Sequence, residues 1–271
     1  YDLGELGGIC AKGLTLHLRE GNPAPRIAET PMGILNSVGL QNPGVDAFIG
    51  EELPFLRRFD TKVIANISGN TPEEYGIMCE KLSAAGVDMI EVNISCPNVK
   101  AGGLAYGTRP KLAAEVTEVA KRHAGPVPVM VKLSPNVTDI TEIARAAADA
   151  GADALSLINT IRGMRIDVNT RRPVLKMNTG GLSGPAVLPV AVRMVWEVAQ
   201  AVDIPILGMG GVAKGEDAAQ LMLAGASAVA VGTALFADPF TPLKVRDSLA
   251  EIAGKQGLSA VSGLTGGVKP W

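Results

Sequence analysis

The feature that most constrains the fold of this chain is a regular alternation of short apolar runs with amphipathic helical stretches. Each apolar run ends at or near Gly, Asn or Ser, which is typical of parallel strands covered on both faces. Strands are predicted at residues 8–13, 62–68, 88–94, 127–133, 154–159, 204–209 and 228–232. Helices are predicted at residues 71–85, 108–123, 138–150, 185–202, 215–224 and 240–255.

This βα repeat of about 25 residues favours an α/β fold of the TIM (β/α)8 barrel type over an open, doubly wound sheet. No Gly-x-Gly-x-x-Gly opens the first βα turn, which argues against the open sheet. A closed barrel has eight strands and seven are found, so we expect the first strand upstream of Tyr1. Residues 1–271 are predicted to form a single barrel domain.

Two long segments interrupt the repeat. Residues 15–44 exceed a plain connection, so we interpret them as a functional insertion that forms an extra hairpin layer over the barrel mouth. Residues 161–184 follow a predicted strand and form a second long loop.

Charge and cysteine content bear on the class of protein. The 25 basic and 27 acidic residues give a net charge of −2, so nucleic acid and anionic membranes are not expected partners. Three scattered cysteines and two histidines fit neither a disulfide framework nor a metal site, and a reducing, cytoplasmic location is expected. No apolar run reaches the roughly 18 residues of a membrane span.

A cysteine at the end of a predicted strand is the first candidate for chemistry. Cys96 follows the apolar run of residues 88–94 and lies between Asn93 and Asn98. A free cysteine is more often a small buried side chain, but asparagines offer both donors and acceptors to a planar polar ring. With only two histidines in the chain, Cys96 is the natural acid/base candidate near neutral pH.

Glycine clusters after the last two predicted strands indicate a phosphate site. Gly208-Met209-Gly210-Gly211 follows one strand, and Gly232-Thr233 follows the next. Glycines let backbone N–H groups approach an anion, and barrels often bind phosphate with the loops after strands seven and eight. Either cluster alone could be an ordinary tight turn. A third cluster at residues 179–184 could close over the same group.

Polar side chains also gather at the predicted strand ends. Lys12 and Lys132 end two of the strands and face the expected barrel mouth, where a cation could stabilise a reduced flavin; either could instead be a paired or partly solvated lysine. Asparagines at similar positions suggest a pocket that reads a ring with carbonyl and N–H groups, although any one could be structural. These are Asn36, Asn66, Asn93, Asn98 and Asn159.

The motifs together resemble the dihydroorotate dehydrogenase family over essentially the whole chain. The matching pieces are Asn93-Ile94-Ser95-Cys96-Pro97-Asn98-Val99, Arg19-Glu20-Gly21-Asn22-Pro23, Leu35-Asn36-Ser37-Val38-Gly39-Leu40, Asn42-Pro43-Gly44, Ile158-Asn159-Thr160, Thr179-Gly180-Gly181-Leu182-Ser183-Gly184 and Gly208-Met209-Gly210-Gly211.

This resemblance implies a barrel that binds FMN at its mouth and oxidises dihydroorotate to orotate in pyrimidine biosynthesis. Cys96 would remove the C5 proton, and FMN N5 would accept the C6 hydride. The implied substrate contacts are Lys12, Asn36, Val38, Gly39, Leu40, Asn93, Asn98, Asn159 and Thr160. The implied FMN contacts are Lys12, Asn66, Asn93, Lys132, Ile158, Gly181, Gly210, Gly211, Gly232 and Thr233.

The amino-acid sequence of two segments is most similar to that of the NAD-linked type of class 1 enzyme. Cysteine rather than serine at position 96 implies class 1, and residues 27–31 and 98–103 favour the NAD-linked over the fumarate-linked type. That type implies a partner subunit carrying FAD and a [2Fe–2S] cluster, a homodimer of the catalytic subunit and a heterotetramer overall.

Other readings remain open from the sequence. A related FMN enzyme acting on uracil or thymine would share the barrel and the loop cysteine. A flavin-binding or phosphate-binding protein without turnover is a further alternative, because the family's first strand and its Ala-Ser-Gly-type loop are missing from this sequence.

Overall fold

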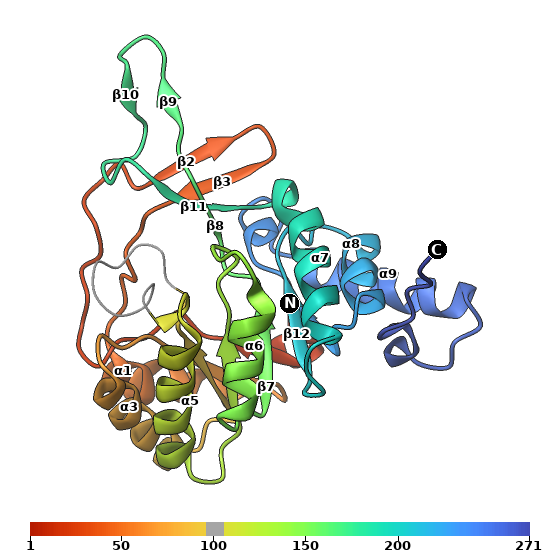
Figure 1. Ribbon diagram of the computed structural model, residues 1–271, viewed down its shortest axis with the longest axis horizontal. Coiled ribbons are helices and arrows are strands. Elements are labelled where there is room, and N and C mark those ends of the chain that lie inside the picture. The colour runs from red at the N-terminus through yellow and green to blue at the C-terminus, as the bar shows by residue number, and fades with distance from the viewer. Residues whose placement is uncertain (96–105) are drawn as a thin grey trace.

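A curled sheet of seven parallel strands forms the centre of the structure, a computed structural model that describes residues 1–95 and 106–271 (Figure 1). The strands lie in the order β1-β4-β5-β6-β7-β12-β13, so neighbours in this sheet follow one another along the chain. They are β1 (Gly8–Cys10), β4 (Lys62–Ile67), β5 (Met89–Asn93), β6 (Val129–Lys132), β7 (Ala154–Leu157), β12 (Ile206–Met209) and β13 (Ala228–Ala230).

All seven predicted strands are confirmed, and each observed strand lies within its predicted run. In the part of the chain that the structure describes, β1 pairs only with β4 and β13 only with β12, so the curled sheet is open between them. The upstream strand therefore stays a prediction.

The helices form an outer ring in which each packs on the next, from α3 on α5 to α8 on α9 (Figure 1). Parallel strands with helices around them confirm the predicted β/α-barrel architecture. The long helices are α3 (Pro72–Ala85), α5 (Pro110–Ala124), α6 (Ile140–Asp149), α7 (Leu188–Ala199), α8 (Gly215–Leu223) and α9 (Thr241–Lys255). The short ones are η1 (Leu3–Glu5), α1 (Val45–Ala47), η2 (Phe48–Glu52), α2 (Leu53–Leu56), η3 (Pro185–Val187), η4 (Thr233–Phe236) and η5 (Val261–Leu264).

Local signals explain where these helices begin and end. The Thr71 side chain accepts a hydrogen bond from the backbone N–H of Glu74 at the start of α3. Gly86 ends the same helix with a φ of 76°, a conformation that disfavours any residue with a Cβ. The helix predicted at residues 185–202 is divided, because η3 precedes α7.

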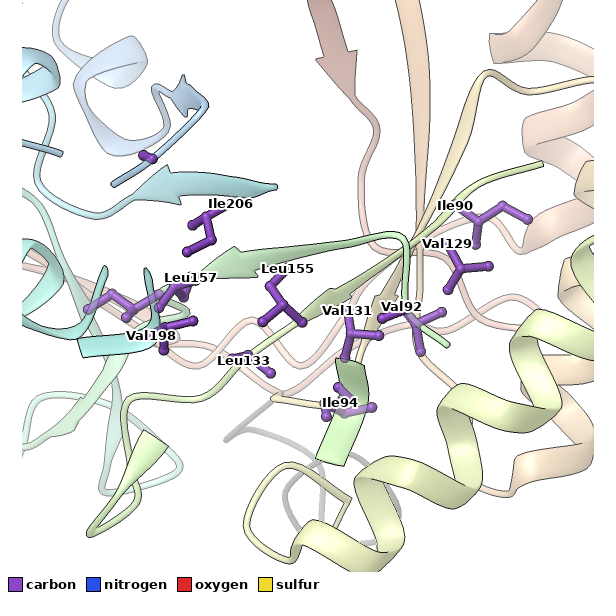
Figure 2. Packing of buried hydrophobic residues seen from close by; sticks show 14 of the residues in the cluster. Ile90, Val92, Ile94, Val129, Val131, Leu133, Leu155, Leu157, Val198 and Ile206 are labelled. Carbon is purple, nitrogen blue, oxygen red and sulfur yellow. The ribbon is translucent and has the colours of Figure 1, made fainter. Parts of the chain in front are cut away.

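Strand periodicity separates the hydrophobic core from the barrel interior. Ile90, Val92 and Ile94 of the β5 segment pack in one buried cluster with residues of the surrounding helices (Figure 2). Because side chains alternate across a strand, Glu91 and Asn93 point to the opposite face, toward the barrel interior. The same alternation places Asn66, Lys132 and Ser156 inside and their apolar neighbours outside; all five polar residues are thereby directed to one space. Those neighbours are Ala65, Ile67, Val131, Leu133, Leu155 and Leu157.

A second, four-stranded antiparallel sheet, here called the mouth layer, confirms the extra layer predicted from residues 15–44. Its order is β2-β3-β11-β8, and it is reached directly from the carboxyl end of β7 (Figure 1). The strands are β2 (Ile27–Thr30), β3 (Gly33–Asn36), β8 (Ile161–Gly163) and β11 (Gly180–Ser183).

The prediction that residues 161–184 form a long loop is partly wrong, because the segment contains strands. It supplies two strands of the mouth layer and a hairpin arm, β9 (Ile166–Asp167) with β10 (Arg172–Pro173), that extends away from the barrel (Figure 1). The apolar alternation that marks strands is weak in these short, Gly-rich and Arg-rich stretches, so the sequence alone did not reveal them.

Close backbone packing in the mouth layer gives a first testable expectation. A Cβ added at Gly33 would lie 2.1 Å from the carbonyl oxygen of Ser183, in the backbone of the partner strand β11. Gly33→Ala should lower the free energy of unfolding by about 1–3 kcal/mol, as overpacking usually does, in a urea titration. Gly50→Ala is the control, because a Cβ there meets nothing within 4 Å. Equal stability of the two variants would contradict this packing account.

Candidate active site

A buried carboxylate at the centre of five neighbouring strands organises the candidate site. Glu91 is 0% exposed, and its two carboxylate oxygens receive hydrogen bonds from donors on β1, β4, β6 and β7. Ser156 Oγ donates to Oε1 at 2.6 Å. Oε2 accepts from Cys10 Sγ at 3.3 Å, from Lys132 Nζ at 3.5 Å, and from Asn66 Nδ2.

The ionisation states of this cluster follow from its contacts. Burial alone would raise the pKa of Glu91, but the Lys132 ammonium and the donors Ser156, Asn66 and Cys10 outweigh it and hold that pKa below its usual value. Burial opposes the charge on Lys132, yet the Glu91 carboxylate raises the pKa of Lys132 above its ordinary value. The pair is therefore charged at neutral pH.

The same cluster keeps the neighbouring thiol protonated. Loss of solvation around the sulfur first and the Glu91 charge second raise the pKa of Cys10 above that of a free cysteine, although the residue as a whole is exposed. The protonated thiol of Cys10 is therefore a hydrogen-bond donor to Glu91 in this site.

A chain of amides leads from Glu91 to the loop that precedes Cys96. Asn93 Nδ2 donates to Asn66 Oδ1 at 3.5 Å, and Asn93 Oδ1 accepts from Ser95 Oγ at 2.8 Å and from Asn159 Nδ2 at 3.4 Å. Asn159 Nδ2 also donates to Ser95 Oγ at 2.6 Å. The structure thus brings together the predicted residues Asn66, Asn93, Asn159 and Lys132.

The mouth layer brings a second set of predicted residues to the same end of the barrel. Asn36 pairs with Gly181 across β3 and β11, and a Cβ at Gly181 would overlap Thr160 Oγ1 at 2.0 Å. A Cβ at Gly13, next to Lys12, would lie 2.8 Å from Asn66 Oδ1 and 3.1 Å from Leu40. Residues of the mouth layer, the loop after it and the barrel floor therefore adjoin one another.

Local backbone geometry shapes the loop that carries Val38, Gly39 and Leu40. Gly39 and Leu40 have positive φ values of 79° and 57°, and the Asn42 side chain donates to the Leu40 carbonyl at 2.7 Å. The hydroxyl of Ser37 is buried and has no hydrogen-bond partner among the described residues. A buried hydroxyl normally has a partner, so a polar group that is not part of the described chain fits here.

Four residues follow β12 and β13 at one edge of the sheet, because these two strands are parallel neighbours. They are Gly210, Gly211, Gly232 and Thr233, here called the glycine cradle. Gly210 and Gly211 have φ values of 123° and 83°, and a Cβ at Gly210 would lie 3.1 Å from Ile158. Within the described residues, none of the four cradle N–H groups donates a hydrogen bond to the protein. Such donors suit an anion.

The structure also shows the surroundings of Gly181, which the sequence resemblance predicts as an FMN contact. Gly181 lies in β11, opposite Asn36 and against Thr160, so it belongs to the mouth layer. Cys96 and Asn98, the catalytic and substrate-binding predictions in the loop after β5, lie outside the described residues.

Sequence reasoning missed four residues of the cluster. Glu91, Ser156, Cys10 and Ser95 were not selected, although Glu91 and Ser156 each interrupt an apolar strand. An acid at the inward position of a buried strand, two residues before Asn93, was the available signal, because a charged residue is rarely buried without a partner.

The described residues contain neither a candidate metal cluster nor a helix suited to span a membrane. Across residues 1–95 and 106–271, no group of three or more His, Cys, Asp or Glu side chains could hold a metal ion. The same ranges contain no helix with the length and apolar character needed to cross a membrane.

Comparison with known proteins identifies the family. The model of the family described as "Dihydroorotate dehydrogenase" matches residues 1–253. A protein of Geotalea daltonii is 55% identical over 269 residues, which cover 99% of this chain and 88% of that protein. One from Geobacillus kaustophilus is 56% identical over 263 residues, or 97% of this chain and 84% of that protein. Both are named dihydroorotate dehydrogenase B (NAD(+)), catalytic subunit. The chain therefore belongs to the dihydroorotate dehydrogenase family, as its sequence motifs predict.

Proposed function

We propose that this chain is the catalytic subunit of an NAD-linked dihydroorotate dehydrogenase, which oxidises dihydroorotate to orotate in pyrimidine biosynthesis. The observation that carries the proposal is the joined network of Glu91, Lys132, Asn66, Asn93 and Asn159 at the barrel mouth. A polar network of this kind, buried and rich in amides, suits planar rings with several carbonyl and N–H groups. Family membership and the names of the relatives support the same activity.

The residues present fit FMN as the cofactor. The glycine cradle offers free N–H groups for its phosphate, and Lys132, Asn66 and Asn93 would hold the polar edge of its ring, with Lys12 and Ile158 beside it. Bound there, FMN would supply the acceptor for the hydride that leaves C6 of dihydroorotate. The Lys132 ammonium would stabilise negative charge that develops on the ring.

The chain's own residues would handle the substrate and its proton. In this proposal Cys96 takes the proton from C5, and Asn36, Asn93, Asn98, Asn159 and Thr160 hold the carboxylate and amide edges of the ring. The backbone N–H of Thr160 donates to Asn159 Oδ1 at 2.7 Å, which leaves the Asn159 amide fixed toward Ser95 and Asn93. Gly39 and Leu40 would close the pocket from the loop that follows β3.

A partner subunit completes the proposed reaction. A chain with three cysteines cannot supply four thiolates to an iron–sulfur cluster, so electrons bound for NAD need a second protein carrying FAD and a [2Fe–2S] centre. A homodimer of this chain joined to two such subunits is the assembly that we propose.

The test is a visible absorption spectrum of the purified protein, followed by addition of dihydroorotate without oxygen. Oxidised flavin bands that bleach on addition are the expected result. Bands that bleach only with dihydrouracil would replace the substrate by an uncharged pyrimidine. A protein that retains no flavin, even with its partner subunit present, would overturn the proposal.

The glycine cradle gives an expectation that separates binding from folding. At Gly211, with φ of 83°, an added Cβ would lie 2.8 Å from the backbone N of Leu188, so Gly211→Ala should distort the cradle. We expect FMN retention after gel filtration to fall by roughly tenfold, the effect of about 1.4 kcal/mol. Gly257→Ala is the matched control, since φ there is 72° but a Cβ meets nothing within 4 Å. Equal flavin loss in both variants would remove the cradle from phosphate binding.

A further inference from the structure

Glu91 is a buried ionised group that the proposed reaction does not use. It donates nothing, accepts from four side chains on four other strands, and lies at the floor of the proposed flavin site. Such a carboxylate depends on donors of this kind, because an unpaired buried charge is strongly unfavourable. Because burial of this charge costs solvation free energy, we looked for a function that the carboxylate could serve.

An ionised carboxylate can only accept hydrogen bonds, and this determines which way each asparagine amide in the network faces. Asn66 can meet the Glu91 carboxylate only with its NH₂ group, so Asn66 Oδ1 must face the other way, toward Asn93. Asn93 then presents its NH₂ to Asn66 and keeps its oxygen for Ser95 and Asn159. The charge on Glu91 thereby determines which amide atoms of Asn66 and Asn93 remain available to bind a ring in the site.

The same carboxylate fixes the lysine. Lys132 ends β6 with its side chain 17% exposed, and Glu91 Oε2 lies 3.5 Å from its ammonium. The titratable groups that face Glu91 are Lys132 from β6 and Cys10 from β1; Asn66 from β4 and Ser156 from β7 are neutral. Lys132 is therefore the one cation among the donors that the described residues give to this carboxylate.

We propose that Glu91 is a positioning residue, which orients the Asn66 and Asn93 amides and holds the Lys132 ammonium at the flavin ring. The inference rests on the proposed function, since it assigns the ring that these groups address. Glu91 itself touches neither the substrate nor the reacting atoms in this account.

The test compares Glu91→Gln with Ser156→Ala. The first removes the charge and lets position 91 donate as well as accept, so Asn66 can turn over. The second removes the 2.6 Å donor to Oε1 but leaves the charge, Asn66 and Lys132 in place. We expect Glu91→Gln to weaken FMN binding to the apoprotein roughly tenfold or more, measured by quenching of flavin fluorescence, and Ser156→Ala to change it less than threefold. Equal loss in both variants would reduce Glu91 to a structural role and overturn the proposal.

The pH dependence of the flavin midpoint potential provides a readout that packing alone does not move. Without Glu91, burial disfavours the Lys132 ammonium, so its pKa should fall below the ordinary value of about 10.4. We expect a new ionisation in the potential between about pH 7 and 10 in Glu91→Gln. It should be absent in the wild type and in Glu91→Gln/Lys132→Met. A wild-type profile in Glu91→Gln would contradict the assignment.

The flavin-free protein separates this inference from the proposed function. In the wild type the pKa of Lys132 is raised, so its stabilisation is lost only as the pH rises above the ordinary lysine value. In Glu91→Gln the sign reverses, and the melting temperature relative to wild type should rise between about pH 7 and 10.

Each outcome on the flavin-free protein has a defined meaning. A rise in relative melting temperature supports the ion pair even if no flavin is ever found, in which case only the proposed function fails. Parallel profiles overturn the inference while leaving the function intact. Should Glu91→Gln not fold, the double variant Glu91→Gln/Lys132→Met must fold, since it buries no unpaired charge; failure of the double variant would also overturn the pair.

Discussion

Cys96→Ser is expected to slow the reduction of bound flavin by dihydroorotate by two orders of magnitude or more, in line with the roughly 10²–10⁴-fold that a general base contributes. A serine hydroxyl is a far weaker acid than a thiol, whose ordinary pKa is about 8.5. Since the deprotonated group is the base, the rate should rise with pH in the wild type, and the rise should move to higher pH in the variant. Anaerobic stopped-flow measurement of flavin bleaching between pH 6 and 10 tests both expectations.

The control for this substitution is Cys79→Ala, at a cysteine that is fully buried in α3 and part of the hydrophobic core. That variant should be less stable, because the substitution leaves a small cavity in the core. It should still reduce its flavin at the wild-type rate. If Cys96→Ser also kept the wild-type rate and pH profile, Cys96 would not be the base.

Lys132→Met should lower the free energy of unfolding by about 3–5 kcal/mol at pH 8, because it leaves Glu91 as an unpaired buried carboxylate. In the wild type the pKa of Glu91 is lowered, so the pair stabilises the fold above the unfolded value of about 4.3 and loses this effect as the pH falls. In the variant the neutral donors remain but the Lys132 charge, the largest of the effects that oppose burial, is lost, so the pKa of Glu91 should rise. The variant should therefore recover stability relative to wild type as the pH falls from 8 toward 5, measured by urea unfolding.

A surface lysine provides the comparison. Lys62 pairs with Asp88 at 3.2 Å, but its side chain is 74% exposed, so Lys62→Met should cost less than about 1 kcal/mol. Adding Glu91→Gln to Lys132→Met should restore much of the lost stability. A Lys132→Met variant as stable as Lys62→Met, with no pH dependence of the difference, would show that the buried pair does not stabilise the fold.

The barrel could be predicted from sequence because its signals are local. Each strand of the main sheet is a short apolar run followed by a break, and all seven runs contain an observed strand. Helix ends were predicted to within a few residues for the same reason. The mouth layer depends on pairing between residues far apart in the sequence, such as Ile34 with Ser183, which no local pattern specifies.

The site was predicted in part. Asn66, Asn93, Asn159 and Lys132 do meet, because parallel strands bring their carboxyl ends to one edge. Glu91 was missed because the local sequence around a single charged residue in an apolar strand does not show which donors will surround it in the fold. The roles of Cys96 and Asn98 remain predictions, since both lie outside the described residues.

The mouth layer also bears on the order in which the molecule can assemble. β3 and β11 are joined by hydrogen bonds although Ile34 and Ser183 are 149 positions apart in the chain. Pairing at such separation must bear the entropy of closing a very long loop, which is easier once β4 to β7 have already folded between them. The mouth layer would then be set in place after the strands that carry Asn66, Asn93 and Lys132. During folding, the chain would thus acquire the polar network of the central strands before it acquires the antiparallel layer beside it.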